Sequence, residues 1–178
     1  MHLTAGTAES DLISQCKKGN LKSQEMLYKH FYGFAMGIAL RYCITRDDAM
    51  EAVNDGFIKV FKSIDNYQPE KPFKAWLRTI VVNTAIDSRR KEMKQWLHTE
   101  LDNAAGISAG NTIIADLNAR DILQLLNHLP QMHRLVFNMY EVDGYSHDEI
   151  AGELGIPASS SRVYLTRAKE KLRKMITS

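Results

Sequence analysis

The sequence predicts an all-α protein of two small helical domains joined by a flexible linker, with a helix-turn-helix in the C-terminal domain. Apolar residues recur at helical spacing along most of the chain, and no window alternates apolar and polar residues between turn signals as a strand would. The segment His98–Asp116 differs, because it holds two glycines, several small polar residues and no Lys or Arg. Such a composition is typical of a linker, so we expect domains at residues 1–95 and 118–178, with the linker at 96–117.

Eight segments have the apolar spacing and end signals of helices. They are residues 10–30, 33–44, 47–64, 73–95, 117–129, 131–142, 147–154 and 160–176.

The helix expected at 47–64 has two unlike faces. On a helical wheel of about 100° per residue, one side is apolar and is predicted to face the core: Met50, Val53, Phe57, Val60, Phe61 and Ile64. The opposite side carries Asp48, Glu51, Asp55 and Lys59, flanked by Asn54. This acidic row is either a solvated surface or a docking strip for a basic partner, and the pattern alone leaves both open.

The helix expected at 73–95 combines a core-facing apolar set, including Trp76, with cations at Lys74, Arg78, Arg89 and Arg90. These cations are either solvated or contact backbone phosphates of a nucleic acid. Asn83 lies among apolar residues, where its amide would bond the local backbone or read a base edge.

The loop before this helix, Asp65–Pro72, is marked by two prolines and Asn66. Tyr67 and Phe73 bracket the loop. An exposed aromatic ring beside cations would offer a stacking surface to an unpaired base.

The C-terminal segment predicts a helix-turn-helix. A helix ends at Gly144, and Ser146-His147-Asp148-Glu149 then forms an S-x-x-E capping box before an apolar run. Gly155 stops this short helix, and a second helix begins near Ser159–Ser161. Its apolar face is Leu165, Ala168, Leu172 and Ile176. In such a motif the second helix presents polar residues to the DNA major groove; the alternative is a plain helical hairpin with a solvated basic face.

Composition excludes several other classes of protein. The 178 residues carry 23 basic and 21 acidic side chains, a net charge of +2, and 44% of them are hydrophobic, which is too many for a disordered chain. Cys16 and Cys43 cannot build a disulfide framework, and no Cys/His set has metal-ligand spacing, so we expect no metal or other cofactor. The sequence shows no targeting segment and no apolar run of membrane-spanning length, so we expect a cytoplasmic protein without membrane insertion.

The near-neutral total conceals charged blocks. Residues 47–55 carry four acids and no base, whereas residues 71–94 and 162–178 each carry a net charge of +5. This pattern favours two anion-binding surfaces and one surface for a basic partner.

Three strings together resemble bacterial RNA polymerase sigma factors of the extracytoplasmic-function (ECF) class. They are DDAMEAVNDGFIKVF, FKAWLRTIVVNTAIDSRRK and LNHLPQMHRLVFNMYEVDGYSHDEIAGELGIPASSSRVYLTRAKEKLRK. Residues 1–95 resemble sigma domain two, which docks on polymerase and recognises and melts the −10 element, and residues 118–178 resemble sigma domain four, which reads the −35 element. The resemblance implies a non-enzymatic factor that directs promoter-specific initiation.

The resemblance implies roles for particular residues. Polymerase contacts would be Asp48, Glu51, Asn54 and Asp55; contacts to the −10 element would be Asn66, Tyr67, Lys74, Arg78, Asn83, Arg89 and Arg90; and contacts to the −35 element would be Ser160, Ser161, Arg162, Tyr164, Thr166, Arg167 and Lys169. The loop 66–71 would capture a base flipped out of the −10 element. The implied partners are the clamp and flap regions of core RNA polymerase, promoter DNA and an anti-sigma factor.

The sequence departs from the family at several positions. Ser161, Val163 and Tyr164 stand where Val, Ser and Arg are frequent, so the family's −35 base preference does not carry over to this sequence and one expected cation is missing. Asn54 replaces a frequent Gln, and Gly56 a frequent larger residue. Two other readings stay open at this point: a polymerase-independent helix-turn-helix regulator, and an interaction module or enzyme with an incidental helix-turn-helix.

Overall fold

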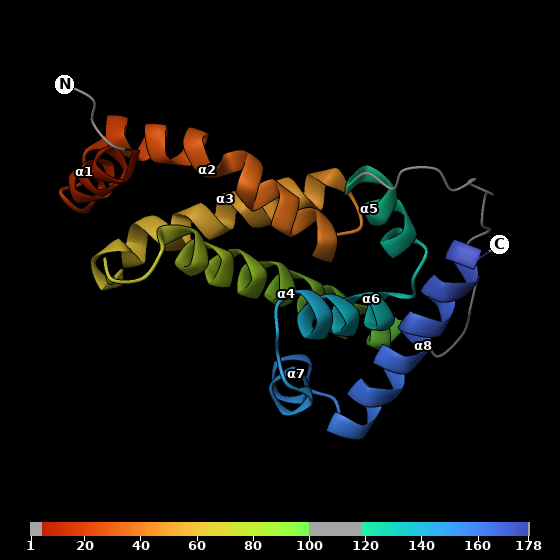
Figure 1. The fold of residues 1–178 in the computed structure, drawn as a ribbon. Helices are drawn as coiled ribbons and strands as arrows, with labels where there is room; N and C mark the ends of the chain where they lie inside the picture. Colours follow the sequence, from red (N-terminus) through yellow and green to blue (C-terminus); the bar gives the residue numbers. More distant parts are fainter. Residues whose placement is uncertain (1–4, 100–118, 178) are drawn as a thin grey trace. The chain divides into compact units, whose positions relative to one another are not determined.

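The chain is helical throughout the part that the structure describes. The structure, a computed structural model, describes residues 5–99 and 119–177, and no strand occurs among them. The helices are α1 (Ala5–Lys17), α2 (Leu21–Tyr42), α3 (Arg46–Ser63), α4 (Phe73–Thr99), α5 (Ala119–Asn127), α6 (Gln131–Phe137), α7 (His147–Leu154) and α8 (Ala158–Thr177), with a 3₁₀ turn at Ile64–Asn66 and a π-helical turn at Asn138–Val142 (Figure 1). This agrees with the predicted all-α class.

The contacts divide the chain into two compact units, Met1–Asp87 and Ser88–Ser178, and each is described by itself below. Most of the predicted linker at 96–117 lies outside the described residues, although α4 extends through its first positions to Thr99. Among the described helices, none is long and apolar enough to cross a membrane.

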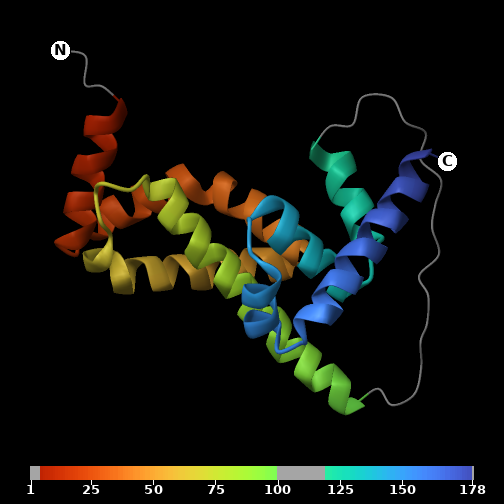
Figure 2. The same cartoon turned by 60° about the horizontal axis from the view of Figure 1, so that its bottom comes forward.

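The N-terminal unit is built on the pairing of α2 with α3, which lie side by side in both ribbon views (Figures 1 and 2). Aromatic contacts hold these helices together: Phe31 of α2 packs against Phe73 of α4 with ring centroids 5.0 Å apart, and Tyr28 of α2 meets Phe57 of α3 at 4.8 Å. The buried Gly56 faces α4, where a Cβ would lie 3.4 Å from Val81 Cγ2. The small residue at this position therefore permits close packing against Val81.

The break between the first two helices falls elsewhere than predicted. The sequence predicted helices at 10–30 and 33–44, whereas α1 ends at Lys17 and α2 runs unbroken to Tyr42. Gly19 has φ +77°, a conformation that disfavours other residues, and the Asn20 side chain accepts a hydrogen bond from Ser23 N at 3.0 Å. The prediction was wrong because it placed the break at residues 31–32, which lie inside α2, and not at Gly19 and Asn20.

A capping box that the sequence analysis missed starts α3. Asp48 N donates to Thr45 Oγ1 at 3.1 Å, and Thr45 N donates to the Asp48 carboxylate at 3.3 Å. The buried face of α3 is Ala49, Ala52, Val53, Gly56, Phe57 and Val60. Met50, predicted in the core, is instead 43% exposed, because the inward row follows i, i+3, i+4 and i+7 spacing from Ala49.

In the C-terminal unit, α8 packs against α5, α6 and α7. Its core includes Leu126 and Leu129 against Ala168, with Phe137, Leu172 and Met175 packed around them. Ile176, predicted on the apolar face of α8, is 42% exposed, and Met175 takes the inward position. The helix predicted at 131–142 does span that range, but its last turn is π-helical, with Asp143 N bonded to Asn138 O.

The cap at the start of α2 can be tested by substitution. Asn20→Ala removes the side-chain acceptor for Ser23 N and is expected to lower the free energy of unfolding of the N-terminal unit by about 1 kcal/mol. Asn20→Asp keeps an acceptor at the same place and should preserve most of the stability. Urea unfolding of the full chain, followed by hydrogen exchange of α2 amides, measures both. Equal stability of Asn20→Ala and the parent chain would contradict the assignment.

Candidate nucleic-acid and protein-binding surfaces

The turn between α7 and α8 fixes how α8 is presented. As predicted, Ser146 and Glu149 form a capping box: Glu149 N donates to Ser146 Oγ at 3.2 Å, and Ser146 N donates to Glu149 Oε2 at 2.7 Å. These bonds lower the pKa of the Glu149 carboxyl. Gly155 ends α7 with φ +66°, and Ile156 N donates back to Ala151 O at 3.2 Å. Helices α7 and α8 and the turn between them form the predicted helix-turn-helix, with α7 beside the start of α8 (Figure 2).

The exposed side of α8 carries a small group of residues that we call the reading face: Arg162, Val163, Thr166 and Arg167. These four residues and Glu170 line a shallow hollow along the helix. Three of the four were predicted to contact the −35 element. The fourth, Val163, was not in the predicted site, yet it is 45% exposed between the two arginines.

Ser161, predicted to read the −35 element, does not lie on the reading face. Its side chain is fully buried, and its Oγ lies 2.9 Å from His147 Nδ1 of α7. The reason is helical periodicity: Ser161 shares the inward row of α8 with Leu165 and Ala168, four and seven residues further on. Ser161 therefore joins the two helices of the motif and is not presented to a base.

Two of the three other predicted −35 contacts, Tyr164 and Lys169, have partners within the unit. Ser160 and Tyr164 are half-buried, and the Tyr164 ring lies 5.5 Å from the ring of His133 on α6. Lys169 Nζ pairs with Glu141 at 2.6 Å. The contacts of Tyr164 and Lys169 tie α8 to the preceding helical segments of the unit.

Two histidines contact α8, which the sequence analysis did not anticipate. His133 packs on Tyr164, and His147 lies against Ser161 while its ring stacks on Tyr140 at 4.5 Å. Burial, followed by the cations of α8, lowers the pKa of both imidazoles: Arg167 and Lys171 act on His133, and Arg162 acts on His147. No spacing in the sequence signals these contacts, because they join separate helices.

On α3, three of the four predicted polymerase contacts are exposed. Glu51, Asn54 and Asp55 face outward, whereas Asp48 is half-buried in the capping box. The hydroxyl of Tyr28 on α2 donates to Asn54 Oδ1 at 2.9 Å, which holds the amide of Asn54 in place.

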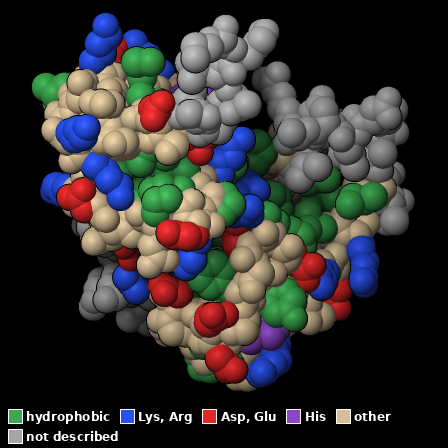
Figure 3. Space-filling view, turned by 60° about the vertical axis from the view of Figure 1, so that its left-hand side comes forward, with side chains coloured by type: hydrophobic (Ala, Val, Ile, Leu, Met, Phe, Trp, Pro, Cys, Tyr) green, Lys and Arg blue, Asp and Glu red, His purple; other side chains and the backbone are tan. Residues whose placement is uncertain are grey.

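Two apolar side chains accompany the acids of α3. Met50 and Ile58, each four residues from Asn54, are 43% and 50% exposed. We call these five residues, Met50, Glu51, Asn54, Asp55 and Ile58, the α3 face. Figure 3 shows the mixture of hydrophobic, acidic and basic side chains on one face of the molecule. Met50 and Ile58 therefore add apolar area to the acidic side of α3.

Tyr67 was predicted as an exposed stacking surface, and this is wrong. The ring is 8% exposed and packs against Phe73 and Trp76, with ring centroids 5.3 Å away in each case. Its hydroxyl donates to Lys71 O at 2.6 Å, so Tyr67 holds the loop closed from within, and burial raises its pKa.

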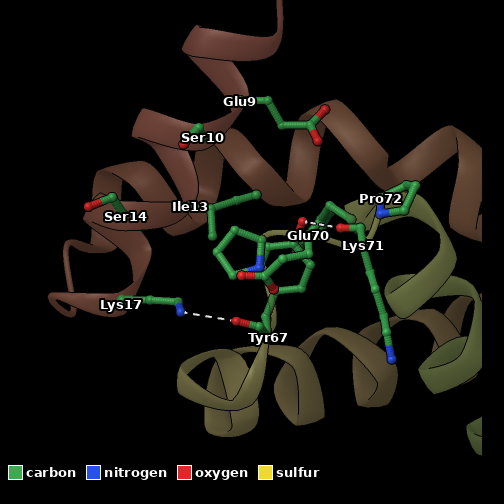
Figure 4. Close-up of a pocket in the computed structure, with 11 residues that line it drawn as sticks. Glu9, Ser10, Ile13, Ser14, Lys17, Tyr67, Glu70, Lys71 and Pro72 are labelled. Carbon is green, nitrogen blue, oxygen red and sulfur yellow. Dashed lines mark hydrogen bonds between the residues drawn. The ribbon is translucent and has the colours of Figure 1, made fainter.

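A cavity of about 530 Å³ lies between this loop and α1. Figure 4 shows Ser10, Ile13 and Ser14 on the α1 side, and Tyr67, Glu70 and Lys71 on the loop side. Lys17 Nζ donates to Tyr67 O at 3.2 Å, which ties the loop to α1. Hydrogen bonds thus tie the loop both to α1 and across itself.

The remaining predicted −10 residues differ in exposure. Asn66, Lys74 and Asn83 are exposed, and Arg78 is half-buried. Arg89, predicted to hold a strand phosphate, is 2% exposed, because it follows Val82, Ala85 and Ile86 along a buried side of α4. Within the second unit, Arg90 Nη1 donates to Glu153 O at 3.2 Å. Among the cations predicted to contact the −10 element, Lys74 is therefore the most exposed.

A capped helix-turn-helix with a cationic reading face, in a chain whose other unit exposes an acidic helix, defines a two-part DNA-binding protein of transcription. Comparison with known families gives the particular class. Residues 27–95 match Sigma-70 region 2, and residues 119–172 match Sigma-70 region 4. The chain belongs to the sigma-70 family of RNA polymerase sigma factors, in its ECF class.

Curated relatives extend over nearly the whole chain. The ECF RNA polymerase sigma-E factor of Haemophilus influenzae is 25% identical over 177 residues, covering 93% of each chain. The sigma-E factor of Escherichia coli is 23% identical over 173 residues, covering 90% of each. Among solved structures, the sigma factor RpoE in complex with the anti-sigma factor NepR from Bartonella quintana is similar in fold, with a TM-score of 0.53, 19% identity, and coverage of 88% of this chain and 98% of that one.

The two histidines that contact α8 predict a pH dependence of stability. Because the pKa of each is lower in the folded chain than its ordinary value of about 6.5, the unfolded chain binds protons more tightly. Their contribution therefore favours folding above about pH 6.5 and is lost as the pH falls through that value towards the lowered pKa. We expect the thermal midpoint of the C-terminal unit to drop between about pH 7.5 and 5.5.

The variants His147→Gln and His133→Phe should each flatten this drop, whereas substitution of the exposed His30 by Gln should leave it unchanged. Thermal unfolding followed by hydrogen exchange of α8 amides measures the effect. A pH profile unchanged in both variants would show that other groups control it.

Proposed function

We propose that this protein acts as a promoter-recognition factor that binds core RNA polymerase, reads a −35 element with α8 and engages a −10 element with its N-terminal unit. The observation that carries the proposal is the reading face, where Arg162, Thr166 and Arg167 stand exposed on the second helix of a capped helix-turn-helix. Arginine pairs with guanine in the major groove, and the same cations can hold phosphates. Family membership supports the assignment.

The α3 face is the proposed docking surface for polymerase. Glu51 and Asp55 supply charge for a basic partner, and Met50 and Ile58 supply apolar area that binding would remove from water. Of the two readings that the sequence left open for the acidic row, these exposed apolar neighbours favour docking over simple solvation. Asp48 contributes mainly by holding the start of α3.

The loop before α4 and the exposed side of α4 are the proposed surface for the −10 element. Lys74 offers a phosphate contact, and Asn66 and Asn83 are exposed amides that can bond the edges of unpaired bases. Unstacking a base costs a few kcal/mol, and binding of the open strand to this surface would offset part of that cost. The loop that Tyr67 closes is pre-formed, so less ordering is needed on binding.

This function needs no covalent chemistry from the chain, so we assign it no enzymatic role and no cofactor. Because polymerase and promoter occupy the bacterial cytoplasm, we place the protein there. One structural neighbour was solved with an anti-sigma factor, and we propose that a protein of that kind binds this chain as well. A polymerase-independent regulator would not require the α3 face, and the sigma-70 match disfavours that alternative.

Docking can be tested by reversing charge on the α3 face. The double variant Glu51→Lys and Asp55→Lys should weaken binding to core polymerase by about tenfold or more, because like charges would then meet across the interface. Asp11→Lys, an exposed reversal on α1, is the matched control and should bind as the parent does. Binding is measured by fluorescence titration with purified core, and circular dichroism checks that helicity is retained. Equal affinity of the double variant and the control would refute the docking role.

The roles of the two arginines can be separated by salt titration of the holoenzyme on promoter DNA. If Arg162 or Arg167 pairs with guanine, its Ala variant should lose about 1–3 kcal/mol and relax selectivity at one base pair. If it holds a phosphate, the slope of log K against log salt should fall by about one with selectivity unchanged. The control is Lys22→Ala on α2. No loss in either arginine variant would remove α8 from the promoter contact.

A further inference from the structure

The reading face carries two methyl-bearing side chains between its arginines. Val163 and Thr166 lie three residues apart on α8, so they are neighbours on the helix surface. Val163 is 45% exposed, and both residues line the hollow that Arg162 and Arg167 also border. A single exposed valine is common on protein surfaces, and a second observation is therefore needed to give it a role.

The second observation concerns the hydroxyl of Thr166. Its Oγ1 donates to Arg162 O at 3.0 Å, one turn back in the same helix. This bond directs the hydroxyl to the backbone and leaves the Cγ2 methyl as the outward group of an exposed side chain. Thr166 therefore extends the apolar surface of Val163 and is not poised to read a base by hydrogen bonding.

We propose that Val163 and Thr166 read a thymine in the −35 element by contact with its C5-methyl group. In the major groove, the thymine methyl is the apolar feature that a base pair presents, and cytosine lacks it. The flanking Arg162 and Arg167 can donate hydrogen bonds to guanine, so the reading face combines a central apolar contact with hydrogen-bond donors on both sides. This inference rests on the proposed function, and it names the base-discriminating residues of that same site.

The position of these methyl groups favours DNA over a protein as their partner. They lie between two exposed arginines on a helix whose C-terminal block is strongly basic, which attracts phosphate backbones and would repel a basic protein. A polymerase contact at Val163 is the competing outcome, and the experiment below distinguishes it.

The experiment uses full-length protein assembled with core polymerase. Promoters are first selected from a library randomised across the −35 region, and each thymine of the selected element is then replaced by deoxyuridine, which removes the methyl and keeps the base pairing. The parent holoenzyme should bind about fourfold more weakly when the recognised methyl is lost, which corresponds to ~0.8 kcal/mol per methyl group.

Variants assign the effect to the two residues. Val163→Ala should bind the parent element more weakly and lose most of its response to deoxyuridine. Thr166→Ser removes the methyl but keeps the hydroxyl bond to Arg162 O, so it should weaken that response, whereas Thr166→Val keeps a methyl and should retain it. Ile176→Ala, an exposed apolar truncation at the far end of α8, is the control and should respond as the parent does.

The outcomes separate this inference from the proposed function. Failure to select any promoter would count against the proposed function and the inference together. If promoters are selected but the parent holoenzyme binds all of them equally well with thymine or deoxyuridine, the inference alone is overturned. This comparison uses only the parent protein, so it does not depend on whether a variant folds. If Val163→Ala binds core polymerase more weakly but responds to deoxyuridine as the parent does, the inferred thymine contact is overturned in favour of a protein contact.

Discussion

The buried row of side chains on α8 determines which side chains of this helix are exposed and can contact DNA. This row runs from Ser161 through Leu165 and Ala168 to Met175, and it is held against the other helices of the unit. A helix buried along such a row cannot rotate without exposing apolar area, at about 25 cal/mol for each Å². The reading face is consequently fixed by the core behind it. Ser161 supports this arrangement at the end nearest the turn, where its contact with His147 joins α7 to α8.

The same constraint acts on α3. Burial of Ala49, Val53 and Phe57 turns the opposite rows outward, so acids and apolar residues are exposed together. The capping box of Thr45 and Asp48 starts the helix at a defined residue and so fixes this rotation from its first turn. In both units, therefore, the proposed binding surface is the exposed side of an amphipathic helix whose other side packs in the core.

The sequence predicts the helix-turn-helix well because its signals are local. The capping residues and Gly155 lie within a few residues of the helix ends that they predict, and the structure has helix ends at these places. The apolar and basic positions of the second helix likewise follow helical spacing over a short stretch of sequence. Errors arose where the outcome depends on which helix lies opposite. The sequence predicted an exposed Tyr67 beside cations, but the ring is buried against Phe73 and Trp76. It also predicted Arg89 as a surface cation, but this residue lies on a buried side of α4. The acidic row of α3 was identified, yet its exposed partners Met50 and Ile58 were not, because a wheel gives periodicity and not the exact angle of burial.

Promoter recognition of this kind depends on several modest contacts acting together. In the proposed function, an arginine on α8 that pairs with a base would contribute about 1–3 kcal/mol and a methyl contact ~0.8 kcal/mol. The surface beside the closed loop of the N-terminal unit would add further contacts of this kind. Opening the duplex opposes them by a few kcal/mol per unstacked base. Because both units belong to one chain, and polymerase binding would hold that chain at the DNA, the second contact is made at a high effective concentration once the first has formed. Weak individual contacts then favour selectivity, because a wrong base at either element would cost about 1–3 kcal/mol of a total that no single contact supplies.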